Sequence, residues 1–274
     1  MNKQTTKFVF IGGAPRSGTT MVQNILNSHS TIYGGPEFDW LPSLSHSYAR
    51  IDESIGSGRL SSFCTREEFH HLFTSFLTDL FGISLSKAKK LIFSEKTPDN
   101  VLAFSRIQQI FPEAKFIFVL RDPRAILNSS LQVNKRAKRV SAQGGFGSNL
   151  TQLYNQIAKS ITAGTHFHTT QPNSCYLLVY ENLIQNPQTE LQSLCDFLEI
   201  ELEASMIENK PTQSITSVQN HSSTEAFITP SLLGTGFDQS RINSWQKELS
   251  FWQRKGCSRY FKKKKLKYLQ RYGL

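Results

Sequence analysis

Short hydroxyl side chains and one guanidinium crowd a glycine-rich stretch near the start of the chain, Gly13-Ala14-Pro15-Arg16-Ser17-Gly18-Thr19-Thr20. Backbone N–H groups of a tight turn before a helix point toward an anion, and Arg16 adds a planar cation suited to phosphate or sulfate. Gly13 and Gly18 have Walker A spacing, but Thr19 stands where that loop has its lysine. The stretch argues against an ordinary nucleoside triphosphatase and favours a nucleotide whose one 5′-phosphate carries a transferable group.

Four side chains further along the chain are candidates to complete such a site. Glu37, in a loop rich in glycine and aromatic residues, is a candidate general base. Lys96 follows a short apolar run and could bring a second cation to the anion, although an exposed lysine is the commoner arrangement. Arg121 ends the clearest apolar run and Ser129 follows eight residues later, so both could bind one phosphate; an Arg121-Asp122 pair at a strand end is the simpler alternative.

Alternating strands and helices must position these side chains. Apolar runs at residues 8–11, 91–94, 115–120 and 175–180 are typical of buried strands, and helical spacing of apolar residues fills the segments between them. We therefore predict an α/β fold, a single P-loop-like domain with a mostly parallel central sheet and helices on both faces. Ligands of such sheets gather beyond the carboxyl ends of the strands, where the candidate cations would meet.

Length and charge favour one domain with a basic end. The 274 residues suit a single α/β unit over residues 1–274, with a core at 7–250 and a basic helix at 251–274. The net charge of +10 is typical of nucleic-acid binding, but residues 253–274 hold nine Lys or Arg and no acid, which leaves 22 basic against 21 acidic residues elsewhere. Because the body is nearly neutral, nucleic acid is not the predicted partner.

No metal site or membrane segment is predicted. Four cysteines are scattered along the chain: Cys64, Cys175, Cys195 and Cys257. They form no C-x-x-C pair and have no His spacing that would complete a zinc site, so they are typical of reduced cytosolic thiols. Since neither a charged leader before an apolar segment nor a run of roughly 20 apolar residues is present, we expect a cytoplasmic protein.

The connections carry their own predictions. Residues 33–40 and 52–62 are predicted as loops, and residues 134–149, with four basic side chains and three glycines, as a mobile flap. A capping box at Thr65 begins a helix predicted to pack its Phe and Leu side chains against the core. The last segments are one irregular stretch and two closing helices: residues 210–236, 241–252 and 260–272.

Four separated elements together resemble one family: Pro15-Arg16-Ser17-Gly18-Thr19-Thr20, Arg121 with Ser129, Tyr180-Glu181-Asn182-Leu183, and Trp245-Gln246-Lys247-Glu248-Leu249. They resemble, in order, elements of the sulfotransferases that use 3′-phosphoadenosine 5′-phosphosulfate (PAPS), especially the tyrosylprotein and bacterial glycan-type branches. The resemblance runs from about residue 7 to residue 250. It implies that the first element binds the 5′-phosphosulfate and that the second binds the 3′-phosphate.

The resemblance also implies roles for single residues. Arg16 and Lys96 would stabilise charge on the leaving phosphate, and Glu37, 21 residues after Arg16, falls where the tyrosylprotein branch keeps its catalytic base. The residues expected to bind PAPS are Pro15, Arg16, Ser17, Gly18, Thr19, Thr20, Arg121, Ser129, Tyr180 and Ser223. No metal is implied.

Two departures from the tyrosylprotein pattern stand out. Val133 occupies the place of a further phosphate-binding arginine, so Lys135 or Arg136 would substitute for it. A membrane anchor is not predicted from this sequence, so we expect a bacterial cytoplasmic enzyme rather than a Golgi enzyme.

Other functions stay open. A small-molecule kinase would need ATP and magnesium, and the missing Walker lysine counts against it. A non-catalytic module that binds a membrane surface is suggested by Lys262-Lys263-Lys264-Lys265 and the aromatic residues near it.

For a sulfotransferase, the acceptor hydroxyl could belong to a peptide tyrosine, which the basic tail favours, or to a saccharide or glycolipid. The tail could also contact acidic surfaces.

Overall fold

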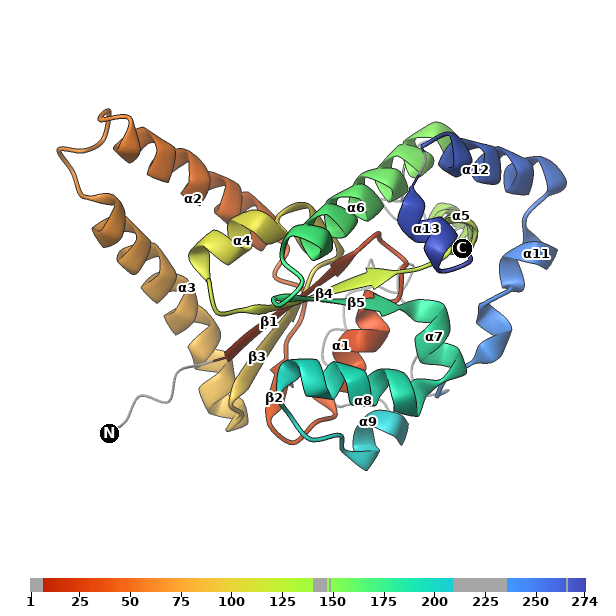
Figure 1. The fold of residues 1–274 in the computed structure, drawn as a ribbon, viewed down its shortest axis with the longest axis horizontal. Coiled ribbons are helices and arrows are strands. Elements are labelled where there is room, and N and C mark those ends of the chain that lie inside the picture. Colours follow the sequence, from red (N-terminus) through yellow and green to blue (C-terminus); the bar gives the residue numbers. More distant parts are fainter. Residues whose placement is uncertain (1–6, 140–146, 148, 209–235, 265) are drawn as a thin grey trace.

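A five-stranded parallel sheet lies at the centre of the computed structural model, which describes residues 7–139, 147, 149–208, 236–264 and 266–274 (Figure 1). The strands are β1 Lys7–Gly13, β2 Ile32–Gly34, β3 Ile92–Lys96, β4 Lys115–Leu120 and β5 Cys175–Val179. Their order is β2-β3-β1-β4-β5, and each neighbouring pair is parallel. The predicted α/β fold with a parallel central sheet is confirmed.

Helices cover both faces of the sheet (Figure 1). On one side lie α4 Phe104–Ile110 and α6 Leu150–Thr170, beside the hairpin of α2 Leu41–Gly56 and α3 Arg66–Ala88; on the other lie α1 Thr19–Asn27, α8 Pro187–Leu198 and α9 Ala204–Glu208. Along β1, Phe8 and Phe10 belong to the first side, and Val9 and Ile11 belong to the second. Because both faces are apolar, β1 is a continuous apolar run.

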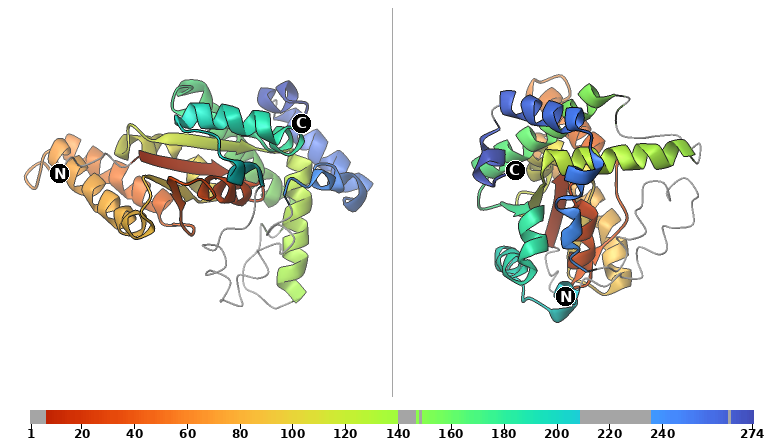
Figure 2. Two further views of the ribbon diagram at one scale, coloured as in Figure 1. Left: turned by 90° about the horizontal axis from the view of Figure 1, so that it is seen from below. Right: turned by 90° about the vertical axis from the view of Figure 1, so that its right-hand side faces the viewer.

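Several helices begin at the carboxyl ends of the strands. They are α1 after β1, the 3₁₀ helix η1 Pro98–Leu102 after β3, α5 Pro123–Arg139 after β4, and α7 Tyr180–Gln185 after β5. Two perpendicular views show α5 projecting away from the sheet (Figure 2). These junctions all lie along one edge, and helix starts supply N–H groups and positive dipole ends there.

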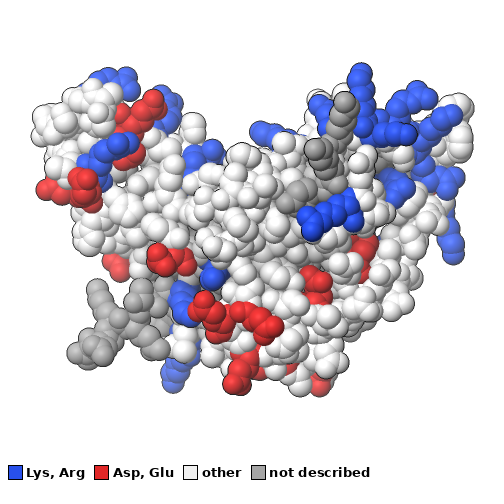
Figure 3. Space-filling view, viewed as in Figure 1, with Lys and Arg blue, Asp and Glu red and all other residues white. Residues whose placement is uncertain are grey.

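The described C-terminal elements are η4 Gln239–Arg241, α11 Ser244–Glu248, α12 Phe251–Lys263 and α13 Lys267–Arg271. Two of these four, α11 and α12, pack against α5. Lys and Arg side chains gather over α12, whereas Asp and Glu gather over the α8–α9 side (Figure 3). Among the described residues, the length and apolarity that a bilayer crossing requires are not combined in any helix.

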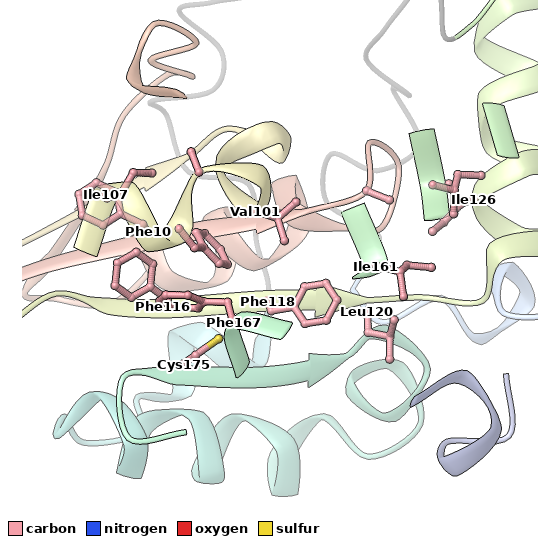
Figure 4. Packing of buried hydrophobic residues seen from close by; sticks show 14 of the residues in the cluster. Phe10, Val101, Ile107, Phe116, Phe118, Leu120, Ile126, Ile161, Phe167 and Cys175 are labelled. Carbon is pink, nitrogen blue, oxygen red and sulfur yellow. The ribbon is translucent and has the colours of Figure 1, made fainter. Parts of the chain in front are cut away.

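Phenylalanine rings fill the core between the sheet and the α4–α6 side (Figure 4). The Phe116 ring lies 5.8 Å from Phe10, 5.1 Å from Phe104 and 4.9 Å from Phe167, measured between centroids. Each fully buried ring contributes roughly 2–3 kcal/mol by leaving water. This packing fixes β1 and β4, the two strands whose ends carry Arg16 and Arg121.

The prediction of loops before and after α2 is partly wrong. Residues 32–34 form the edge strand β2, and α2 continues to Gly56, so only residues 57–62 of the predicted loop at 52–62 lie beyond the helix. β2 is too short to show a strand period. α2 buries only four side chains, so its sequence shows little helical apolar pattern.

The prediction of a mobile flap at residues 134–149 is wrong at its start. Residues 134–139 form the last turns of α5, because Val133 and Ala137 continue its buried face at i, i+4 spacing. Residues 140–146 and 148 of this segment lie outside the described residues.

The closing helices differ from the prediction. Residues 241–252 are divided among η4, α11 and the start of α12, and α12 ends at Lys263 before α13 begins at Lys267. Residues 210–235 of the predicted irregular segment lie outside the described residues. The basic end at 251–264 and 266–274 therefore holds two helices.

The predicted capping box of α3 is confirmed. Glu68 N–H donates to Thr65 Oγ1 at 3.2 Å, and Thr65 N–H donates to Glu68 Oε2 at 2.8 Å. The prediction for its apolar face is partly wrong, because Leu77 is buried but Leu72 and Phe76 are 65% and 56% exposed. The helix has apolar side chains on two sides, and only one faces the core.

Candidate active site

The loop between β1 and α1 is shaped by left-handed backbone. Arg16 and Gly18 have φ of 74° and 107°, and Ser17 N–H donates to the Ala14 carbonyl at 2.9 Å. Gly18 precedes α1 without a side-chain cap, so the first N–H groups of α1 suit an anion. Ser17 Oγ is buried and has no hydrogen-bond partner among the described residues. This orphaned hydroxyl and the uncapped helix start fit the predicted phosphosulfate group.

Arg121 and Tyr180 support this loop from behind. The Arg121 guanidinium lies 4.1 Å from the centre of the Tyr180 ring, and its Nη1 donates to the Arg16 carbonyl at 3.0 Å. A Cβ at Gly18 would lie 2.5 Å from Tyr180 Cδ2, which explains why glycine is required there. Arg121 Nε is buried and has no partner among the described residues, so it fits a further acceptor.

Ser129 lies beside the loop. Its Oγ accepts a hydrogen bond from Arg16 Nε at 3.1 Å, so the structure brings together two residues predicted for opposite ends of PAPS. Burial, followed by the charges of Arg136, Arg121 and Arg241, lowers the pKa of Arg16 to about 10. Four guanidinium groups therefore concentrate positive charge where two anionic groups are expected.

The position of Val133 favours one of the two predicted substitutes. Val133 is fully buried, and Lys135 is exposed. Arg136 is close enough to Arg16 for its charge to lower the pKa of Arg16. Arg136, rather than Lys135, is therefore the better candidate for the second phosphate contact from α5.

Lys96 contacts both the first turn of α1 and the candidate base Glu37. It is only 6% exposed, so the alternative of a solvent-exposed lysine is wrong. Its register partner on β1 is Ile11, and its Nζ donates to Thr20 Oγ1 at 3.2 Å and forms an ion pair with Glu37. The Glu37 side chain is 47% exposed, so it remains reachable from solvent.

The two later elements pack near the Arg121 junction. Asp122 forms an ion pair at 2.6 Å with Arg124 and not with Arg121. Its N–H donates to Glu181 Oε1 at 3.0 Å. Arg124 also lies 4.1 Å from the Trp245 ring centre. The simple Arg121-Asp122 pair is therefore wrong, and these contacts hold the end of β4 in place.

The remaining candidates differ in placement. Thr19 is buried in the first turn of α1, Pro15 is half-buried beside Arg16, and Ser223 lies outside the described residues. Across the part of the chain that the structure describes, no group of three or more His, Cys, Asp or Glu side chains could hold a metal ion.

One buried carboxylate near the site, Glu95, is not among the site residues that the sequence predicts. Glu95 is 1% exposed, precedes Lys96, and accepts the N–H of Phe38, the residue after Glu37, at 2.9 Å. Its place directly after the apolar run at residues 91–94 is the only sequence signal for it.

Comparison with known proteins identifies the family. A model of the sulfotransferase family matches residues 9–204. A putative protein-tyrosine sulfotransferase of Caenorhabditis briggsae is 30% identical over 203 residues, which are 73% of this chain and 68% of the relative. The chain belongs to the sulfotransferase family and is thus a transferase enzyme. It spans about half the length or less of several other curated relatives that it matches.

Solved structures show the same fold. The sulfotransferase domain from the curacin biosynthetic pathway has a TM-score of 0.61 at 18% identity, covering 94% of this chain and 98% of that domain. A mouse sulfotransferase complexed with PAP, the desulfated form of PAPS, has a TM-score of 0.54 at 11% identity, covering 94% and 84%. At such identities the likeness is evidence for the P-loop-like fold alone.

Proposed function

We propose that this chain transfers a sulfuryl group from PAPS to an acceptor hydroxyl, with Glu37 as general base. The observation that carries the proposal is the placement of Lys96, whose ammonium contacts both Glu37 and Thr20. The candidate base Glu37 and the anion-binding start of α1 therefore meet at one buried cation, the ammonium of Lys96. In-line sulfuryl transfer requires these three groups close together.

The proposed PAPS site has two anionic halves. The loop of Pro15, Arg16, Ser17, Gly18, Thr19 and Thr20 binds the 5′-phosphosulfate, and Arg121, Ser129 and Arg136 bind the 3′-phosphate. Tyr180 and Ser223 complete the proposed set. Support comes from the buried Ser17 Oγ and Arg121 Nε and from the cluster of guanidinium groups around Arg16. The related mouse fold was crystallised with PAP.

In the proposed reaction the acceptor oxygen attacks the sulfur of PAPS. A new S–O bond forms to the acceptor, the S–O bond to the 5′-phosphate breaks, and the acceptor proton passes to Glu37. Lys96 and Arg16 then face the charge that develops on the departing phosphate. No step of this transfer requires a metal ion.

The proposed acceptor is a tyrosine in an acidic peptide. The support is the name of the C. briggsae relative and the basic surface over α12, which would attract acidic side chains (Figure 3). A saccharide or glycolipid hydroxyl is the alternative acceptor, and the same basic surface could contact other acidic surfaces.

We further propose a single cytoplasmic catalytic domain, since all four cysteines are free thiols.

The test combines an acceptor panel with a carboxylate variant. The protein is incubated with labelled PAPS and with acidic tyrosine peptides, matched neutral peptides, saccharides and glycolipids. We expect label on the acidic tyrosine peptide, and Glu37→Gln should reduce turnover about a hundredfold or more while PAP binding changes little. The matched control is Asp39→Asn, which removes an exposed carboxylate from the same loop.

Three results would contradict parts of the proposal. Turnover of Glu37→Gln equal to that of the unaltered protein would exclude Glu37 as the base. Label on saccharides alone would replace the proposed acceptor. Binding of ATP with magnesium in preference to PAP would favour a kinase.

A further inference from the structure

Glu95 lies next to Lys96 of the proposed site, and its environment is unusual for a carboxylate. It is 1% exposed, yet three donors surround it. Oε1 accepts the Phe38 N–H at 2.9 Å and the Thr97 hydroxyl at 2.8 Å, and Oε2 accepts Asn100 Nδ2 at 2.5 Å. Because a buried charge without partners costs several kcal/mol, these three donors are what permits the carboxylate to ionise there.

The network joins the segments that carry the catalytic candidates. Phe38 follows Glu37 in the loop, Glu95 precedes Lys96 on β3, and Asn100 Nδ2 also donates to the Ile11 carbonyl of β1 at 3.3 Å. One carboxylate therefore connects the loop of the proposed base with the two strands that place Lys96 and the phosphosulfate loop.

We propose that Glu95 is a positioning residue whose ionised carboxylate holds the Phe38 backbone and thereby keeps Glu37 against Lys96. The inference rests on the proposed role of Glu37 as base. In this role Glu95 touches neither the acceptor nor the reacting atoms. It acts on the rate by fixing the geometry of the group that takes the proton.

The environment makes this role sensitive to pH. Burial raises the pKa of Glu95 to about 7, and the hydrogen bonds from Asn100, Phe38 and Thr97 and the charge of Lys96 oppose the rise. The charge that acts on Glu95 is that of Lys96 on β3, which is itself paired with Glu37. Asp99 on η1 has its pKa raised by burial, and its charged neighbours are Lys159 and Glu37. Protonation of Glu95 therefore falls near neutral pH.

Protonation of Glu95 would weaken its contacts with both Asn100 and Phe38. A proton on Oε2 would face the Asn100 Nδ2 donor, so the Asn100 amide must turn to present Oδ1, which is buried and has no partner among the described residues. Turning moves Nδ2 away from the Ile11 carbonyl. The neutral carboxyl is also a weaker acceptor for the Phe38 N–H. We therefore expect turnover to fall as the pH drops below about 7.

The test is Glu95→Gln, which has the shape of the protonated carboxyl. Turnover at saturating PAPS and acceptor is measured from about pH 5.5 to about pH 9. The unaltered protein should lose turnover with a midpoint near 7. Glu95→Gln should be about tenfold slower at alkaline pH and flat through that region, with PAP affinity unchanged. Glu190→Gln, which alters a half-buried carboxylate on α8 bonded to Tyr176, is the matched control and should keep the midpoint.

A second variant guards against misfolding of the first. Thr97→Val removes one donor to the ionised carboxylate, which raises the pKa of Glu95 and should move the midpoint to higher pH. A midpoint left in place by either Glu95→Gln or Thr97→Val would overturn the proposal.

Stability measurements separate this inference from the proposed function. Since the folded-state pKa of about 7 exceeds the usual 4.5, the contribution of Glu95 to stability is fully present below about pH 4.5 and is lost as the pH rises to about 7. The stability of Glu95→Gln should be flatter across that window. Failure of every acceptor would refute the proposed function, whereas equal pH slopes of stability for Glu95→Gln and the unaltered protein would refute the Glu95 proposal.

Discussion

The carboxyl edge of the sheet and the α2–α3 hairpin distribute charged and apolar side chains in opposite ways. At the edge, charged side chains are buried: Glu95, Lys96 and Arg121 are 1%, 6% and 9% exposed. On the hairpin, large apolar side chains are exposed: Phe63 and Leu72 are 82% and 65% exposed. The edge thus holds charges at a cost in desolvation, which a binding site explains and stability alone does not.

The difference indicates where substitutions should act on function. At the edge each charge has specific partners from other segments, such as Thr20 for Lys96 and the Arg16 carbonyl for Arg121. On the hairpin, Arg66 pairs with Asp52, and the side chains of the two residues are 55% and 26% exposed. We expect edge substitutions to change ligand binding and hairpin substitutions to change stability or nothing.

The largest expected effect tests the hairpin itself. Leu77→Ala should lower the free energy of unfolding by about 2–5 kcal/mol, because Leu77 is fully buried. The neighbouring Phe76→Ala, at a side chain that is 56% exposed, should cost less than about 1 kcal/mol. Urea denaturation measures both. Equal losses would mean that the outer face of α3 packs against another surface and that the contrast between the regions is wrong.

The second effect compares two left-handed glycines. Gly18→Ala places a Cβ 2.5 Å from Tyr180 Cδ2 at φ of 107°, so PAP affinity should fall by roughly 2–3 kcal/mol. Gly58→Ala, at φ of 85° in the hairpin loop with nothing within 4 Å of the new Cβ, should leave PAP affinity unchanged. Isothermal titration with PAP measures both. Unaltered PAP affinity in Gly18→Ala would remove the Gly18–Tyr180 contact from the site.

Local patterns carried most of the fold prediction. Four strands, the turn before α1 and the α3 capping box are each encoded within about ten residues, where periodicity and capping act. The edge strand β2 is too short for a period, and α2 buries too few side chains to show one. The segments that were missed are those with weak local signals.

The sequence predicts single candidate residues for the site, but it does not predict the contacts between them. The burial of Lys96 depends on its pairing beside Ile11, and the role proposed for Glu95 depends on Phe38 and Asn100, from two other segments. Arg16 and Ser129 are separated by 113 positions and still share a hydrogen bond. Such long-range contacts arise from sheet order, which no local pattern specifies.

The smallest expected effect comes from replacing an arginine by lysine in each region, which keeps the positive charge but removes the planar guanidinium. Arg121→Lys keeps the charge but cannot both stack on Tyr180 and reach the Arg16 carbonyl, so PAP should bind about tenfold more weakly. Arg66→Lys is the matched change on the hairpin, where the pair with Asp52 is exposed, and should leave PAP affinity and Tm as they are. Titration with PAP and thermal denaturation measure the two variants side by side. If Arg121→Lys bound PAP as tightly as the unaltered protein, charge alone would suffice at the edge, and the planar contacts seen there would have no part in recognising the 3′-phosphate.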